Sequence, residues 1–185
     1  MKKLWILIFV LSICFTPCAF SLTSVDSKTL AIALKKKTVQ ELRLGEKDAA
    51  TAFLGIYNSQ YPDELKQVEG TILGERHGLA IYSYKKRNFA LGREYVGHYA
   101  IPGSKDKRLR VVLYRNVAAF EMPNLNDGQT VSVNDCTLAG EEVVAISIPL
   151  MKKDVKWKPE KAWRFDTVSS EFKMIDPQKA VCEAW

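Results

Sequence analysis

The chain has 185 residues, with 27 Lys and Arg against 21 Asp and Glu, 47% hydrophobic residues and 26% charged residues. A chain of this length and composition can bury one core, which excludes intrinsic disorder, collagen-like repeats and coiled coils. The formal net charge of +6 is mild, and the sequence lacks the dense basic stripe of nucleic-acid-binding proteins, so we expect no nucleic-acid partner.

The first 21 residues have the pattern of a secretory signal peptide. Lys2 and Lys3 form a positive start, an uncharged apolar run covers Leu4–Phe15, and Ala19-Phe20-Ser21 offers a cleavage site before Leu22. The apolar run is shorter than the roughly 20 residues of a transmembrane helix, so we expect no such helix after cleavage.

Cleavage after Ser21 would leave 164 residues (185 minus 21) and a net charge of +4, because the signal carries two Lys and no acid. An uncleaved N-terminal anchor, or a lipid anchor on Cys14 or Cys18, is the alternative. We predict a signal peptide at 1–21, a single globular domain at 22–185, and a bacterial periplasmic or secreted protein.

Two of the four cysteines, Cys136 and Cys182, belong to the mature chain. An oxidising compartment then allows one intramolecular pair, so we predict a disulfide between them. In the chain-entropy model a loop of this length contributes about 4 kcal/mol to stability. The spacing is not Cys-x-x-Cys, which disfavours a redox-active pair.

Helical spacing of apolar residues precedes the strands. The pattern predicts a first helix from Ser27 to Gly45, capped by Asp26 or by Ser27 itself, and a second helix over 49–57. A short third helix is predicted from Pro62 to about Val68, because proline is favoured in a first helical turn.

From Thr71 onward the apolar residues alternate with a period of two. Glycines inside the second predicted strand, Gly92 and Gly97, indicate a bulge or a close backbone approach. Residues around 163–166 and 172–174 have the pattern of a hairpin. The other strands are predicted over 79–84, 89–100, 108–120, 129–133 and 143–148.

Helices followed by strands predict an α+β fold. We expect two to three N-terminal helices packed on an antiparallel sheet of about six to eight strands, with one disulfide.

The only two histidines, His77 and His98, each lie beside glycine. If the first two predicted strands pair, the histidines would lie near one another, with Glu75 or Glu94 as a carboxylate neighbour. A small periplasmic hydrolase using His77 or His98 is therefore an alternative function. A zinc site needs three or four ligands, so we expect no metal.

Motifs for nucleophilic catalysis and for phosphate-binding loops are missing from the mature sequence, so we expect no cofactor. Ser104, His98 and Asp106 supply the residue types of a triad, but their spacing does not position them. Glu141 and Glu142 are adjacent and would face opposite sides of a strand. The sequence thus favours a protein that is not an enzyme.

Tyrosine and cationic residues concentrate in the first predicted hairpin, and this composition is typical of interaction surfaces. The partner would be an envelope protein or an anionic glycan or lipid headgroup, and the protein a binding, inhibitor or accessory module. A small-ligand carrier with an apolar pocket is a further alternative. The predicted surface comprises Tyr82, Tyr84, Lys85, Lys86, Arg87, Arg93, Tyr95 and Tyr99.

Overall fold

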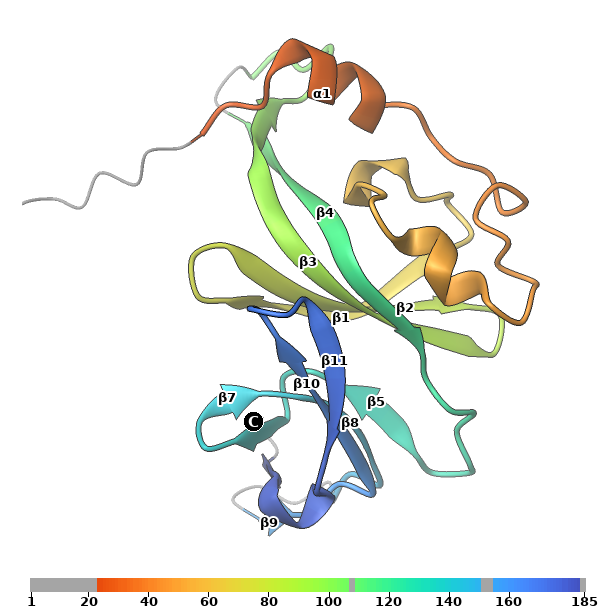
Figure 1. Cartoon of the computed structure of the whole chain (residues 1–185), viewed down its shortest axis with the longest axis vertical. Helices are drawn as coiled ribbons and strands as arrows, with labels where there is room; N and C mark the ends of the chain where they lie inside the picture. The colour runs from red at the N-terminus through yellow and green to blue at the C-terminus, as the bar shows by residue number, and fades with distance from the viewer. Residues whose placement is uncertain (1–22, 107–108, 151–154, 184–185) are drawn as a thin grey trace, which may run out of the picture.

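The computed structural model describes residues 23–106, 109–150 and 155–183 (Figure 1). Within these ranges the chain has one α-helix, α1 (Ser27–Ala33), and twelve strands. Three short 3₁₀ helices complete the regular structure: η1 (Ala49–Phe53), η2 (Asn58–Gln60) and η3 (Pro177–Lys179).

The strands form three antiparallel sheets of four strands each. Sheet A is a meander of β1 (Lys66–Leu73), β2 (His77–Tyr84), β3 (Arg87–Ala100) and β4 (Arg110–Glu121). Sheet B has the order β11-β10-β8-β5 and consists of β5 (Thr130–Ser132), β8 (Val144–Ser147), β10 (Lys161–Asp166) and β11 (Glu171–Ile175). Sheet C has the order β7-β6-β12-β9 and consists of β6 (Cys136–Leu138), β7 (Glu141–Glu142), β9 (Lys156–Trp157) and β12 (Val181–Glu183).

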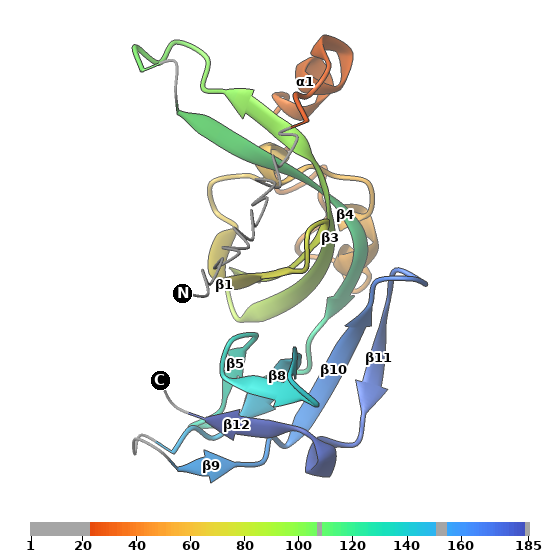
Figure 2. The same ribbon diagram turned by 90° about the vertical axis from the view of Figure 1, so that its left-hand side faces the viewer.

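Three apolar cores hold these layers together. Residues 39–65, hereafter the N-terminal layer, pack on one face of sheet A, and sheet B packs on the other face. Sheets B and C share the third core, which includes the predicted disulfide between Cys136 and Cys182. Figure 2 shows sheet A in the upper half of the molecule and sheets B and C in the lower half.

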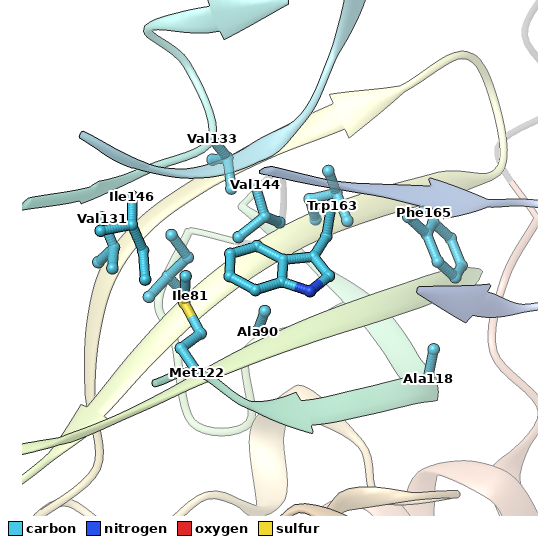
Figure 3. Packing of buried hydrophobic residues seen from close by; sticks show 11 residues of the cluster. Ile81, Ala90, Ala118, Met122, Val131, Val133, Val144, Ile146, Trp163 and Phe165 are labelled. Atoms are coloured by element: carbon cyan, nitrogen blue, oxygen red, sulfur yellow. The ribbon is translucent and has the colours of Figure 1, made fainter. Parts of the chain in front are cut away.

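Sheet A is buried on both faces because its strands carry apolar residues at successive positions. On β2, Leu79 and Ile81 face sheet B, whereas Ala80 and Tyr82 face the N-terminal layer. This follows from the period of two in a strand. Figure 3 shows Trp163 of sheet B lying among the apolar side chains of both sheets.

Both glycines that were expected to disturb β3 do so. The pairing of β3 with β4 shifts between Gly92 and Arg93, and again between Tyr95 and Gly97. A Cβ at Gly92 would lie 2.4 Å from the ring of Phe165, so glycine lets this ring reach the sheet. At Gly97, where φ is +154°, a Cβ would lie 2.7 Å from the carbonyl oxygen of Thr23.

The predicted α+β class is wrong. The described chain is mostly strand, with one α-helix of seven residues, and its three sheets replace the single sheet that was expected. The first predicted helix ends early, at Ala33 instead of Gly45, and the second is reduced to the 3₁₀ turn η1.

Burial of Leu42 and Leu44 explains the loss of the longer helix. Both side chains are almost completely buried in one core, although residues two apart point to different sides of a helix. A local turn also competes with the helix, because the Thr38 hydroxyl accepts from the Glu41 N–H and the Glu41 carboxylate accepts from the Thr38 N–H. Arg43 then has a φ of +50°, outside the helical region.

The third predicted helix is replaced by β1. Its residues from Lys66 onward pair with β2, from Lys66 opposite Ser83 to Leu73 opposite His77. The pattern that begins at Pro62 yields one turn, closed by the bond from the Leu65 N–H to the Pro62 carbonyl. Pairing with a neighbouring strand thus overrides a local helix-start signal.

Candidate functional site

The predicted binding surface is divided between the two ends of β3. Lys85 and Lys86 are exposed at the β2–β3 turn, and Tyr84 is half-buried beside Lys85, whose Nζ lies 5.3 Å from the ring centroid. Tyr95 and Tyr99 are half-buried toward the opposite end of β3. Binding through these residues stays a prediction.

Arg87 fastens the N-terminal layer to sheet A. Its guanidinium pairs with the carboxylate of Glu121 and donates to the carbonyl oxygens of Leu44 and Glu46, at 2.5 and 2.6 Å. The Glu121 carboxylate raises the pKa of Arg87, so the guanidinium stays charged. Its donors are engaged within the chain.

The two histidines lie in different surroundings. His77 begins β2 and is paired in register with Glu94, but the Glu94 carboxylate accepts from Arg115 at 2.8 Å. His98 is buried farther along β3, beside Ser24, and its Nδ1 has no hydrogen-bond partner. Within the described ranges, no group of three His, Cys, Asp or Glu side chains is placed to hold a metal ion.

A cleft of about 810 Å³ lies where residues of the three sheets meet, and we call it the β1–β7 cleft. Figure 1 shows the β1–β2 turn and β7, which both contribute lining residues, at the left of the molecule. Its walls come from the β1–β2 hairpin, from the β6–β7 turn with β7, and from the end of β10. The lining residues are Ile72, Leu73, Gly74, Glu75, Arg76, His77, Gly140, Glu141, Glu142, Arg164, Phe165 and Thr167.

Charges of both signs line the β1–β7 cleft. Arg164 and Glu141 form a long ion pair of 3.8 Å, and the Glu142 carboxylate accepts from the Thr71 hydroxyl at 2.9 Å. The ring of His77 lies edge-on to Phe165, with 6.1 Å between the centroids. The His77 side chain makes no hydrogen bond with the described residues, which leaves it without an orienting carboxylate.

A second polar cluster lies on the opposite face of sheet A, around the buried residues Arg93 and Tyr82. The Arg93 guanidinium stacks on Tyr114, with its Cζ 4.7 Å from the ring centroid, and donates from Nη2 to the Leu79 carbonyl at 3.2 Å. The Tyr82 hydroxyl donates to Oε1 of Gln67 at 2.9 Å.

Burial raises the pKa of both tyrosines in this cluster, Tyr82 and Tyr61. It raises the pKa of Tyr82, an effect that the nearby Arg93 guanidinium opposes. Burial also raises the pKa of Tyr61 strongly, with a further contribution from Tyr82. Both hydroxyls are therefore neutral donors, and the Tyr61 hydroxyl donates to Oδ1 of Asn116 at 2.7 Å.

The sequence indicated Arg93 and Tyr82 but not the residues around them. Gln67, Tyr114 and Asn116 come from strands whose register the sequence did not reveal. The sequence shows that Glu141 and Glu142 are adjacent, but their spacing does not indicate that both line one cleft.

Comparisons with protein-family models, curated proteins and solved structures found no match to this chain. The disulfide points to an oxidising location outside the cytoplasm. None of the described helices has the length and apolar character needed to cross a membrane. The predicted signal peptide lies outside the described residues.

Proposed function

We propose that the protein is an exported, non-catalytic binding module of the bacterial cell envelope, which holds an extended segment of a partner protein in the β1–β7 cleft. The observation that carries this proposal is the position of the cleft between two sheet edges. β1 is an edge strand of sheet A and β7 is an edge strand of sheet C, and residues of both line the cleft.

An edge strand presents N–H and C=O groups that have no partner in its own sheet. Within the described ranges, no other segment forms backbone hydrogen bonds with the outer edge of β1 or of β7. Recognition by an added strand uses such groups for affinity and the pockets between side chains for specificity. An extended segment is therefore the shape of partner that this cleft suits best.

The lining residues suggest the chemistry of the segment. Ile72 is an apolar side chain with 67% of its surface exposed, and it stands at the cleft wall. Arg76 and Glu75 extend from the β1–β2 turn, and Arg164 faces Glu141 across the cleft. A segment that alternates apolar and charged side chains would complement this wall.

The surroundings of the histidines support binding over hydrolysis. A histidine base is normally oriented by a carboxylate, and the carboxylate opposite His77 is already engaged by Arg115. His98 lies under the Thr23–Val25 segment, which pairs with it through the bonds His98 N–H to Thr23 O and Val25 N–H to His98 O. Hydrolysis at His77 is the alternative to be tested alongside binding.

Site-specific photocrosslinking in cells tests the proposal. A photoreactive amino acid at Ile72 should yield a discrete crosslinked partner, and mass spectrometry should map the crosslink to an extended segment of that partner. The matched control is Val168, which is 95% exposed on the β10–β11 turn and does not line the cleft. A third probe at Lys86 tests the predicted basic surface at the other end of β2.

Crosslinks of equal yield from Ile72 and Val168 would contradict specific binding in the cleft. A discrete product from Lys86 alone would move the binding site to the β2–β3 turn. Loss of a hydrolytic activity in a His77→Ala variant, with the Ile72 crosslink absent, would favour the enzyme.

A further inference from the structure

Arg93 is a buried cation with an incomplete set of partners. Its side chain is 7% exposed, and its Nε–H is buried with no hydrogen-bond acceptor. Its Nη2 donates to the Leu79 carbonyl oxygen, and the Tyr82 hydroxyl lies within hydrogen-bonding reach of the guanidinium. None of the described carboxylates forms an ion pair with it.

This arrangement is costly for a folded protein. Burying an unpaired charge carries a large desolvation cost, and stacking on Tyr114 offsets only part of it. Buried arginines are normally paired with a carboxylate because the planar guanidinium matches its two oxygens. The missing component at Arg93 is therefore an anion.

Two glycines make room for the guanidinium on the sheet. Gly78 lies opposite Arg93 in the register, and Gly70 lies on the next strand, so Arg93 extends across β2 toward β1. Cβ atoms built on these glycines would lie 3.6 and 3.5 Å from Nη2 of Arg93. The guanidinium thus reaches the edge strand of the sheet while staying buried.

Gln67 stands between this guanidinium and solvent. Its side chain is exposed on β1, at a position where the pairing with β2 shifts register. Its Oε1 accepts from the Tyr82 hydroxyl, and its Nε2 lies 2.8 Å from the Cβ position of Gly70, beside Arg93. The amide oxygen of Gln67 is thus a neutral acceptor for the Tyr82 hydroxyl, and a carboxylate in its place would accept this bond more strongly.

A cavity of about 420 Å³ opens on the same side. Gln67 and Tyr82 line it together with the apolar surfaces of Tyr61, Pro62 and Leu65. Lys36, Lys66 and Asp63 also line the cavity, and because Lys36 pairs with Asp63 at 3.3 Å, the lining has a net charge of one positive unit from Lys66. A small anion that enters the cavity meets Tyr82 directly, and it reaches Arg93, which is not a lining residue, when the Gln67 side chain moves aside.

We propose that Arg93 and Tyr82 bind the carboxylate of a small organic acid, which enters through this cavity and takes the place of the Gln67 side-chain oxygen. The Tyr82 hydroxyl and the Arg93 guanidinium donate to the carboxylate, while the body of the acid packs on Tyr61, Pro62 and Leu65. The site lies on the opposite face of sheet A from the core shared with sheet B, and it does not depend on the β1–β7 cleft.

The charge of the site selects a monocarboxylate over phosphate. One buried guanidinium balances one negative charge, whereas a dianion would leave a second charge to be desolvated. The apolar wall favours an acid with an apolar body, such as an aromatic acid.

The variant Gln67→Glu tests the proposal because it supplies the carboxylate from the protein itself. It should raise the midpoint of thermal unfolding at pH 7. The benzoate concentration needed to raise this midpoint further should be at least tenfold higher for the variant than for the wild type. Gln178→Glu is the matched control, because Gln178 is an exposed glutamine of η3 on which the same charge change should alter neither property.

The wild-type chain should show a saturable rise in unfolding midpoint with sodium benzoate, measured against sodium chloride at equal ionic strength. Acetate should act at higher concentration than benzoate, because it lacks the apolar body. Sodium phosphate should give no more than the chloride response.

Three results would overturn the proposal. The first is a benzoate response that does not exceed that of chloride, and the second is a phosphate response stronger than that of benzoate. The third is a Gln67→Glu variant that is destabilised and responds to benzoate as the wild type does. An Arg93→Met variant should also lose the response, but Gln67→Glu decides the question because it keeps the buried arginine.

Discussion

The two faces of sheet A are buried by different chemistry. Toward sheet B the contact is mainly apolar, and its centre is formed by Trp163 and Phe165 against the strands of sheet A (Figure 3). Toward the N-terminal layer, the apolar core is interrupted by the buried polar side chains of Arg93 and Asn116.

The difference reflects what packs on each face. Sheet B satisfies most of its backbone through strand pairing, so its contact with sheet A is made mainly by side chains. One exception is the N–H of Val133, directly after β5, which donates to the Glu69 carboxylate at 2.7 Å. The N-terminal layer has little regular structure, and its carbonyl groups need donors from elsewhere. Asn116 donates to the Phe53 carbonyl at 3.0 Å, and Arg87 donates to those of Leu44 and Glu46. The irregular layer thus needs polar side chains of sheet A in addition to its apolar core, whereas the contact with sheet B is mainly apolar.

The largest expected effect is on the apolar face. Trp163→Ala should lower the free energy of unfolding by about 4 kcal/mol, because it removes a buried indole and leaves a cavity between two sheets. Chemical denaturation followed by circular dichroism measures this change. Met174→Ala, at a side chain 71% exposed on the same sheet, should change stability by less than about 0.5 kcal/mol. Equal losses from both variants would contradict an apolar face that holds the layers together.

On the polar face we expect a smaller and more local effect. Asn116→Ala removes one of the two donors to the Phe53 carbonyl, which keeps the Ile56 N–H, and leaves the Tyr61 hydroxyl without its acceptor, at a cost of about 2 kcal/mol. Hydrogen exchange should accelerate in the N-terminal layer, for example at the Gly55 amide that donates to the Asn116 carbonyl. Amides of β8 and β10 should keep their protection.

Tyr61→Phe is the control for that variant. Combining it with Asn116→Ala should cost less than the sum of the two single losses, because both remove the same hydrogen bond. Additive losses would mean that the two side chains do not stabilise the fold through a shared hydrogen bond. Hydrogen exchange that accelerates equally in sheet B would show that the two faces do not open separately.

The same comparison explains how much of the fold the sequence could predict. Strands β2, β3, β4, β8 and the β10–β11 hairpin carry long alternating or apolar runs, and the structure has strands at each of these places. The disulfide prediction is confirmed. It could be made from the sequence because two cysteines in an oxidising compartment allow only one pairing. Sheet C was not foreseen, since its strands have two or three residues and a period cannot be recognised over so few.

The helix prediction was wrong for the N-terminal layer, which polar side chains of sheet A bind through its carbonyl groups. Its apolar residues have helix-like spacing, but their burial depends on carbonyl groups that Asn116 and Arg87 satisfy from 40 or more residues away. Arg93 was predicted as a surface binding residue, yet its role depends on glycines of β1 and β2 lying beneath it. That placement follows from strand register, which composition does not encode.

The smallest expected effect concerns the solvent side of sheet B, where charges stay outside the apolar contact. At the β10–β11 turn the Asp166 carboxylate accepts from Lys173 Nζ at 2.5 Å and from the N–H groups of Val168 and Ser169. The Lys173 ammonium, followed by the two N–H groups, lowers the pKa of Asp166 well below its ordinary value of 3.8. Because the folded state binds a proton less readily than the unfolded state, Asp166 stabilises the fold above this ordinary pKa.

The Asp166→Asn variant should therefore be slightly less stable than the wild type at pH 7, and the difference should shrink as pH falls below about 4 toward the pKa of the folded state. Denaturant unfolding at pH 7 and at pH 2.5 measures both differences. Lys173→Ala should keep part of this pH dependence, since the bonds from Val168 and Ser169 remain. A stability difference between wild type and Asp166→Asn that grows on acidification would contradict this prediction, because it would mean that the carboxylate is stabilised more in the unfolded chain than in the β10–β11 turn.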